Sequence, residues 1–148
     1  MIVNDLITDE IPPLKYTDTV DLALNWMEEF KVNHLAVING KELIGIVSES
    51  ELLDSNHPDF SIDNLKLNLT KPVIHTNQHA YDAIKLMARL NLSLLPVLDE
   101  QENFAGSITQ RSVLEKMAGI TSVQEPGGII VLNMNINDYN LTQIASIV

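Results

Sequence analysis

Cysteine is absent from this 148-residue chain, which therefore has no disulfide, no thiolate zinc site and no cysteine nucleophile. This absence fits a reducing compartment. Long apolar runs are absent too, and a helix needs about 20 apolar residues to cross a bilayer. The first ten residues, MIVNDLITDE, carry acids where a secretory signal needs Lys or Arg. We therefore expect a soluble, cytoplasmic protein.

Basic residues are scarce. The chain has 9 Lys and Arg against 20 Asp and Glu, which gives a formal net charge of -11. A protein that neutralises nucleic-acid phosphates or an anionic membrane needs the opposite sign, so we expect neither partner. An anionic small molecule remains compatible with this charge, because salt screens distant surface charges over about 8 Å.

Signatures of catalysis are also missing. The sequence contains no GxSxG, no HExxH and no Walker phosphate loop. His75 and His79 have the i, i+4 spacing of a metal pair, but no cysteine or clustered carboxylate completes a site. We predict a globular protein that is not an enzyme and needs no metal or other cofactor.

The chain repeats itself with an offset close to sixty residues. TVDLALNWMEEFKVNHLAVIN (19–39) aligns with HAYDAIKLMARLNLSLLPVLD (79–99), and PLKYT (13–17) aligns with PVIHT (72–76). GIVSESELL (45–53) aligns with GSITQRSVL (106–114), so that a glycine, a hydroxyl residue and a leucine recur in order. The repeat predicts two similar halves that share a core.

Each half predicts the same series of elements. In the first, apolar residues at helical spacing indicate a helix from Val20 to Phe30, followed by strands at 34–39 and 42–48 and a helix from Ser48. The second predicts a helix at 80–90, strands at 94–99 and 104–109, and a helix at 110–119. A unit of about 50 residues hides its apolar surface poorly alone. We therefore predict an α/β (α+β) fold of two β-α-β-β-α repeats packed about a pseudo-twofold axis.

This ordered series resembles a tandem pair of cystathionine-β-synthase (CBS) domains, a Bateman module. The resemblance rests on the repeat, the lead segments VNDLI and IDNLK, the strand LLPVLD and the repeated glycine-to-leucine phrase. It implies a first CBS domain at 1–60, a second at 61–119 and a further region at 120–148. It also implies a regulatory homodimer whose clefts hold AMP, ADP, ATP, S-adenosylmethionine or a related adenosine ligand.

The resemblance assigns roles to particular residues. In the family, the hydroxyl after the glycine strand contacts phosphate and an acid three residues later binds the ribose. The first copy offers Ser48 and Glu51 for these roles. The second offers Thr109, but has Ser112 in place of the acid and Arg111 beside it as a phosphate partner. Further contacts are implied for two strands of each copy: Lys15, Tyr16, Thr17, His34, Leu35 and Ala36 in the first, and Ile74, His75, Thr76, Leu95 and Pro96 in the second.

Simpler alternatives stay open for these residues. Ser48 and Thr109 can serve only as helix N-caps, a role worth about 1 kcal/mol, and Glu51 only as a first-turn acid. The whole chain can be a structural homodimerisation module without ligand.

The run IIVLNMNI (129–136) and the helical pattern up to Val148 resemble the start of a truncated ACT domain. We expect this region to receive the signal of ligand binding.

Overall fold

The computed structural model describes residues 1–120, so the ACT-like segment lies outside the described residues. The chain divides into two compact units, Met1–Val113 and Leu114–Val148. In chain order the elements are η1 (Val3–Leu6), β1 (Leu14–Lys15), α1 (Val20–Phe30), β2 (His34–Asn39), β3 (Glu42–Ser48), α2 (Glu49–Ser55), η2 (Ile62–Leu65), β4 (Ile74–His75), α3 (Ala80–Leu90), β5 (Leu94–Leu98), β6 (Phe104–Thr109) and α4 (Gln110–Ile120). No helix within residues 1–120 has the length and apolar character needed to cross a membrane.

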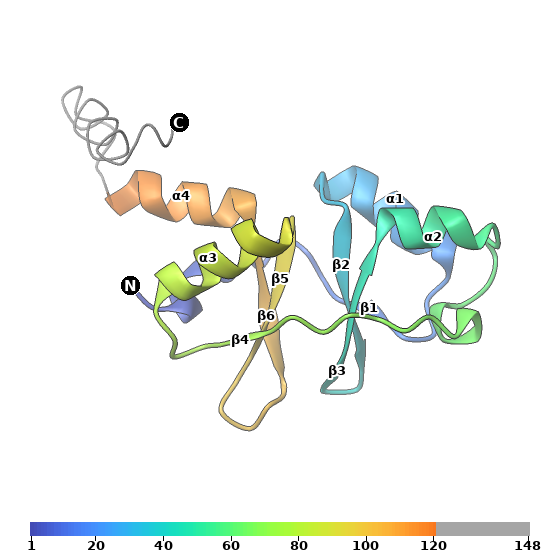
Figure 1. Ribbon diagram of the computed structural model, residues 1–148, viewed down its shortest axis with the longest axis horizontal. Helices are drawn as coiled ribbons and strands as arrows, with labels where there is room; N and C mark the ends of the chain where they lie inside the picture. The colour runs from blue at the N-terminus through green and yellow to red at the C-terminus, as the bar shows by residue number, and fades with distance from the viewer. Residues whose placement is uncertain (121–148) are drawn as a thin grey trace. The chain divides into compact units, whose positions relative to one another are not determined.

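Two three-stranded sheets organise the first unit, with the orders β1-β2-β3 and β4-β5-β6 (Figure 1). In each sheet the first pair of strands is parallel and the second pair is antiparallel. Leu14 pairs with Val37 in one sheet, and Ile74 pairs with Val97 in the other. The predicted series of strand, helix, strand, strand and helix is therefore confirmed in both halves.

Local signals at the ends of α1 explain its length. The Thr19 side chain accepts a hydrogen bond from the backbone N–H of Leu22, at 3.1 Å, and so caps the start of the helix. Lys31 adopts the left-handed conformation at the C-cap, where its N–H donates to the carbonyl of Met27. Between β2 and β3, Gly40 has φ +64°, as a tight hairpin requires.

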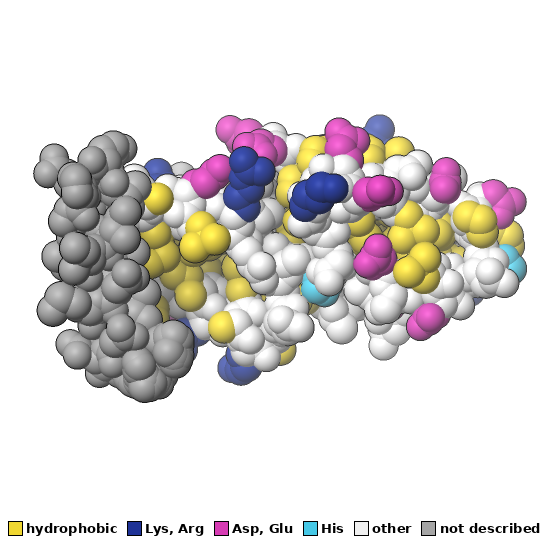
Figure 2. Space-filling view, turned by 90° about the horizontal axis from the view of Figure 1, so that it is seen from above, with side chains coloured by type: hydrophobic (Ala, Val, Ile, Leu, Met, Phe, Trp, Pro, Cys, Tyr) yellow, Lys and Arg dark blue, Asp and Glu magenta, His cyan; other side chains and the backbone are white. Residues whose placement is uncertain are grey.

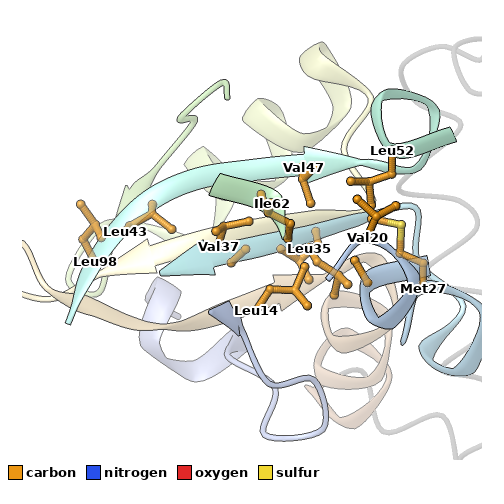
Figure 3. Close-up of a cluster of buried hydrophobic side chains, with 13 residues drawn as sticks. Leu14, Val20, Met27, Leu35, Val37, Leu43, Val47, Leu52, Ile62 and Leu98 are labelled. Carbon is orange, nitrogen blue, oxygen red and sulfur yellow. The ribbon is translucent and has the colours of Figure 1, made fainter. Parts of the chain in front are cut away.

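A buried apolar cluster centred on the first repeat includes two residues of the second repeat, Leu94 and Leu98. Val20 and Met27 from α1 meet Leu35 and other strand residues at exposures of 2% or less. Leu98, from the second repeat, belongs to the same buried cluster and lies near Leu43 in Figure 3. Such burial contributes roughly 1.5–3 kcal/mol for each large apolar side chain. The two repeats therefore stabilise each other.

The N-terminal segment packs against the second repeat. The N–H of Val3 donates to the carbonyl of Gln78 at 2.8 Å, and the N–H of Thr8 donates to the carbonyl of Ser107 at 2.9 Å. Val3 and Leu6 are 0% and 1% exposed. The N-terminal segment therefore packs as part of the second repeat.

The segment between the repeats completes the first repeat in the equivalent way. The N–H of Val20 donates to the carbonyl of Phe60, and the N–H of Ile46 donates to the carbonyl of Thr70 at 2.8 Å. Thr70 therefore lies against β3 as Thr8 lies against β6. Each half is closed by the segment that precedes the other half. The boundary between 60 and 61 stays a prediction.

Candidate functional site

A cleft of about 520 Å³ opens where the end of β3 meets the segment before β4. Three of the residues that the sequence singled out, His34, Ser48 and Glu51, line it together. Its other lining residues are Ile46, Thr70, Lys71, Pro72, Leu90 and Leu92. The cleft therefore combines a carboxylate, an ammonium and an imidazole with apolar side chains.

Ser48 and Glu51 form a reciprocal capping box at the start of α2. The N–H of Glu51 donates to Ser48 Oγ at 3.2 Å, and the N–H of Ser48 donates to Glu51 Oε1 at 3.0 Å. The Ser48 hydroxyl also lies 3.0 Å from Oε1 and donates to it. The expected cap at Ser48 is thus confirmed. No residue within 1–120 donates a hydrogen bond to the other Glu51 oxygen, Oε2.

His34 begins β2 and pairs in register with Ser48 on β3. Its ring is half-buried, and Nδ1 lies 2.9 Å from Ser93 Oγ in the second repeat. Burial lowers the pKa of His34 below 6.5, and the carboxylate of Glu51 acts in the opposite direction. The neutral imidazole is therefore favoured at neutral pH.

Sequence reasoning missed Lys71, the basic side chain that completes this cleft. Lys71 is exposed and directly precedes PVIHT, one of the repeated segments. At the equivalent place before the first copy, the residue that follows Thr8 is Asp9. This reversal of charge between the copies was a usable signal, but only after Thr8 and Thr70 had been recognised as equivalent.

The other predicted contacts in the first copy do not line this cleft. Leu35 and Ala36 are 0% and 1% exposed and belong to the core. Tyr16 is half-buried against the same core, whereas Lys15, the last residue of β1, and Thr17 are exposed. Their assignment to a ligand stays a prediction.

In the second copy, Thr109 and Ser112 satisfy each other. The N–H of Ser112 donates to Thr109 Oγ1 at 3.0 Å, and the N–H of Thr109 donates to Ser112 Oγ at 2.9 Å. Thr109 is only 5% exposed, and Arg111 is exposed. Leu94 takes the place that His34 has in the first copy. This end of the second repeat therefore offers a ligand fewer polar groups than the first.

The remaining predicted contacts of the second copy lie on β4 and β5 or, for Thr76, directly after β4. Ile74, Leu95 and Pro96 are buried. Thr76 is partly buried, and its carbonyl accepts a hydrogen bond from the N–H of Asn4 at 3.0 Å. These residues too stay predictions as ligand contacts.

His75 and His79 make separate interactions. His75 Nε2 lies 2.7 Å from Glu102 Oε2, and His79 Nδ1 accepts a hydrogen bond from the N–H of Tyr81. Across residues 1–120, no group of three or more His, Cys, Asp or Glu side chains is arranged to hold a metal ion.

A second hollow, of about 700 Å³, lies beside α1 and the beginning of α2. Leu24, Glu28, Lys31, Leu53 and Ser93 are among its lining residues. Leu53 is 59% exposed, so this helical side carries uncovered apolar area. Figure 2 shows acidic side chains spread over one face of the described residues, with a few basic side chains among them.

Curated relatives match most of this chain with only part of their own length. The chain is 33% identical over 118 residues to a homoserine O-acetyltransferase of Methanocorpusculum labreanum, covering 76% of this chain and 23% of that enzyme. It spans between 23% and 52% of the length of the first three curated relatives that it matches.

Solved structures match over more of their own length. A CBS domain pair/ACT domain protein from Thermotoga maritima is 26% identical, with a TM-score of 0.69 and coverage of 81% of this chain and 98% of that one. CBSX2, crystallised in complex with AMP, is 25% identical, with a TM-score of 0.68 and coverage of 80% and 97%. Residues 3–57 and 67–119 each match the CBS domain. The chain therefore belongs to the CBS-domain family and carries this domain twice.

Proposed function

We propose that the chain is a non-catalytic regulatory module whose cleft at Ser48 and Glu51 binds an adenine nucleotide. The observation that carries this proposal is the convergence of His34, Glu51 and Lys71 beside apolar side chains in one cleft of about 520 Å³. A nucleotide matches this mixture, because it has an apolar base, a diol and an anion. The complex of the related CBSX2 with AMP supports the same class of ligand.

The hydrogen bonds around α2 suggest how the roles divide. Glu51 Oε2 has no partner within the described residues, so it can accept hydrogen bonds from the ribose hydroxyls. The Ser48 hydroxyl already donates to Glu51 Oε1, and α2 begins with two acids, Glu49 and Glu51. We therefore assign the phosphate to Lys71 in place of Ser48, and the base to Ile46, Leu90 and Leu92.

Ligand binding can act on the whole module because both repeats contribute to the cleft. His34, Ile46 and Glu51 come from the first, whereas Leu90 and Leu92 come from the second. A nucleotide that contacts both sets stabilises the arrangement in which they face one another. The receiver of this change is the region 120–148 in our proposal, and ADP, ATP and S-adenosylmethionine belong in the same ligand screen as AMP.

Calorimetric titration of the full chain with AMP tests the proposal. Glu51→Gln preserves the capping box, since Gln also serves at this position, but removes the charge. We expect its affinity for AMP to fall about tenfold, the loss expected for a charge-assisted hydrogen bond. Ser112→Ala, at the equivalent position of the second repeat, is the matched control and leaves the affinity unchanged. Absence of binding at millimolar AMP, or equal affinity in Glu51→Gln, contradicts the proposal.

A structural homodimerisation module without ligand is the second candidate. It is favoured by the exposed Leu53 beside the larger hollow and by the burial of Thr109. It predicts a dimer whose thermal unfolding midpoint stays the same with each nucleotide. A ligand that binds the folded chain must instead raise this midpoint by mass action.

A further inference from the structure

We infer that Ser93, in the second repeat, fixes the tautomer of His34 so that the first repeat's cleft receives a neutral hydrogen-bond donor at Nε2. The identity of the group that accepts this hydrogen bond rests on the proposed function. The tautomer itself does not, because it follows from contacts within the protein.

The backbone of Ser93 decides which ring nitrogen carries the proton. Its N–H points at His34 Nδ1, with an N-to-N distance of 3.2 Å. A backbone N–H can only donate, so Nδ1 must be the unprotonated, accepting nitrogen. A neutral imidazole carries its one proton on the other nitrogen. The proton of His34 is therefore on Nε2.

The Ser93 hydroxyl supports the same assignment. Ser93 Oγ accepts a hydrogen bond from the N–H of Asn33 at 3.1 Å and lies 2.9 Å from His34 Nδ1. Because Nδ1 has no proton, the hydroxyl must donate to it. Two donors from one residue thus converge on Nδ1, and the contact with Asn33 orients the hydroxyl.

The remaining side of the ring belongs to the cleft. His34 lines it together with Ser48, Glu51 and Lys71, and no residue within 1–120 makes a hydrogen bond to Nε2. The charged groups that share this space are Glu51 from α2 and Lys71 from the segment before β4. Nε2–H is therefore available to an acceptor atom of a bound molecule.

Several effects keep this donor neutral. Burial lowers the pKa of His34, and the negative charge of Glu51, which raises it, is the smaller effect. Protonation at Nδ1 also removes the acceptor of the Ser93 backbone N–H, which further favours the neutral ring. His34 therefore recognises an acceptor, such as a ring nitrogen or a phosphate oxygen, without taking up a proton.

The donor is specific to one of the two repeats. Leu94 stands at the equivalent place in the second repeat and has no donor. In the repeat alignment, Ser93 takes the place of Asn33, so the partner of His34 is not duplicated either. His34 is thus a specificity-determining residue of the first cleft, and Ser93 is its positioning residue.

Nitrogen-15 NMR of the ligand-free full chain tests the tautomer directly. We expect a pyridine-like Nδ1 and a pyrrole-like Nε2 for His34 at pH 7. His79, which also accepts a backbone N–H at Nδ1, provides an internal comparison. A proton on Nδ1 of His34, or a charged ring at pH 7, overturns the inference whether or not AMP binds.

Titration with AMP tests the donor. His34→Gln places an amide N–H near the position of Nε2, so we expect affinity within about threefold of wild type. His34→Asn reaches only the position of Nδ1, and His34→Leu copies the second repeat. Both lose about tenfold, as for one buried hydrogen bond. Equal affinity in His34→Leu overturns the role of the donor. If wild type does not bind AMP, the proposed function fails, and the spectrum still decides the tautomer.

Ser93→Ala separates positioning from simple support of the fold. The backbone N–H remains and keeps the tautomer, but the ring loses the hydroxyl that holds it in place. We expect the affinity of Ser93→Ala for AMP to fall about threefold, and Ser93→Thr, which keeps a hydroxyl, to restore it. A loss of affinity that Ser93→Thr does not restore, or an affinity of Ser93→Ala equal to wild type, contradicts the positioning role.

Discussion

Gly45 and Gly106 hold equivalent positions in the two repeats but have different surroundings. Their φ angles are +157° and +154°, so neither backbone suits a side chain. A Cβ on Gly45 would lie 2.6 Å from the backbone oxygen of Thr70, whereas a Cβ on Gly106 would lie 2.6 Å from Cγ2 of Ile7. A side-chain methyl group can move by rotation about χ1, but the carbonyl of Thr70 is held by its hydrogen bond from Ile46.

Gly45→Ala is therefore expected to destabilise the chain more than Gly106→Ala. Gly45→Ala should lower the free energy of unfolding by about 1–3 kcal/mol more than its matched partner, the usual range for overpacking. Urea unfolding of both variants measures the difference. Equal losses would mean that the segment around Thr70 yields as easily as a side chain.

His34 should make stability depend on pH. Its pKa is lowered in the fold from a usual 6.5, so the unfolded chain binds more protons in the window just below that value. The contribution of neutral His34 is complete above pH 6.5 and is lost as the pH falls. The stability difference between wild type and His34→Gln should shift against wild type between pH 7.5 and 5.5 in urea unfolding. A difference that stays constant over this range would show that the ring titrates normally.

Residues close in sequence were the predictable part of the cleft. Ser48 and Glu51 are three positions apart, and the start of a helix brings them together whatever the rest of the fold does. Lys71 was not predictable in this way, because it reaches the cleft through the pairing of Thr70 with Ile46. The contact of His34 with Ser93 crosses between repeats, and no local pattern marks it.

At the level of elements, periodicity predicted most boundaries well. Strands β2 and β3 and helix α3 begin and end where the apolar pattern does. The first strand of each copy is shorter than predicted, since Tyr16, Thr17 and Thr76 lie beyond its end. β1 ends at Lys15, because the N–H of Asp18 turns back to the carbonyl of Lys15 at 2.9 Å. The sequence did not show which repeat η1 packs against, because the two lead segments, VNDLI and IDNLK, are similar.

Leu6 tests the assignment of η1 to the second repeat. Its side chain is 1% exposed, so Leu6→Ala should lower the free energy of unfolding by about 2–5 kcal/mol. Hydrogen exchange should quicken first at amides of α3 and β6. Ile2→Ala, at a residue 43% exposed, is the matched control with a small effect. Faster exchange confined to β2 and β3 would show that η1 stabilises the first repeat and not the second.

At the scale of the molecule, the shared core and the crossed segments link the two halves. Residues 1–113 form one compact unit, and Leu98 of one repeat lies in the same cluster as Leu14 of the other. Separate melting of the repeats would expose this cluster. We therefore expect the unit to unfold in one step.

Trp26 allows this cooperativity to be measured. It is the chain's one tryptophan and lies in α1 of the first repeat, packed against the core. Its fluorescence should follow the same urea curve as far-UV circular dichroism, which reports both repeats. Leu6→Ala, although it acts on the second repeat, should shift both curves together. Two separated transitions would show that the repeats unfold independently.

The crossing of the segments also has a consequence for the order of synthesis. As the chain leaves the ribosome, Ile7 and Thr8 emerge before Leu69 and Thr70, although β6, which Thr8 finally joins, is the last strand of residues 1–120 to be made. Until Thr70 is made, the edge of β3 that it finally joins is open to the segment around Thr8. Asp9 would then stand near Glu51, and their like charges repel, whereas Lys71 beside Glu51 attracts. We therefore expect the opposite charges of Asp9 and Lys71 to favour the pairing of each segment with its own half.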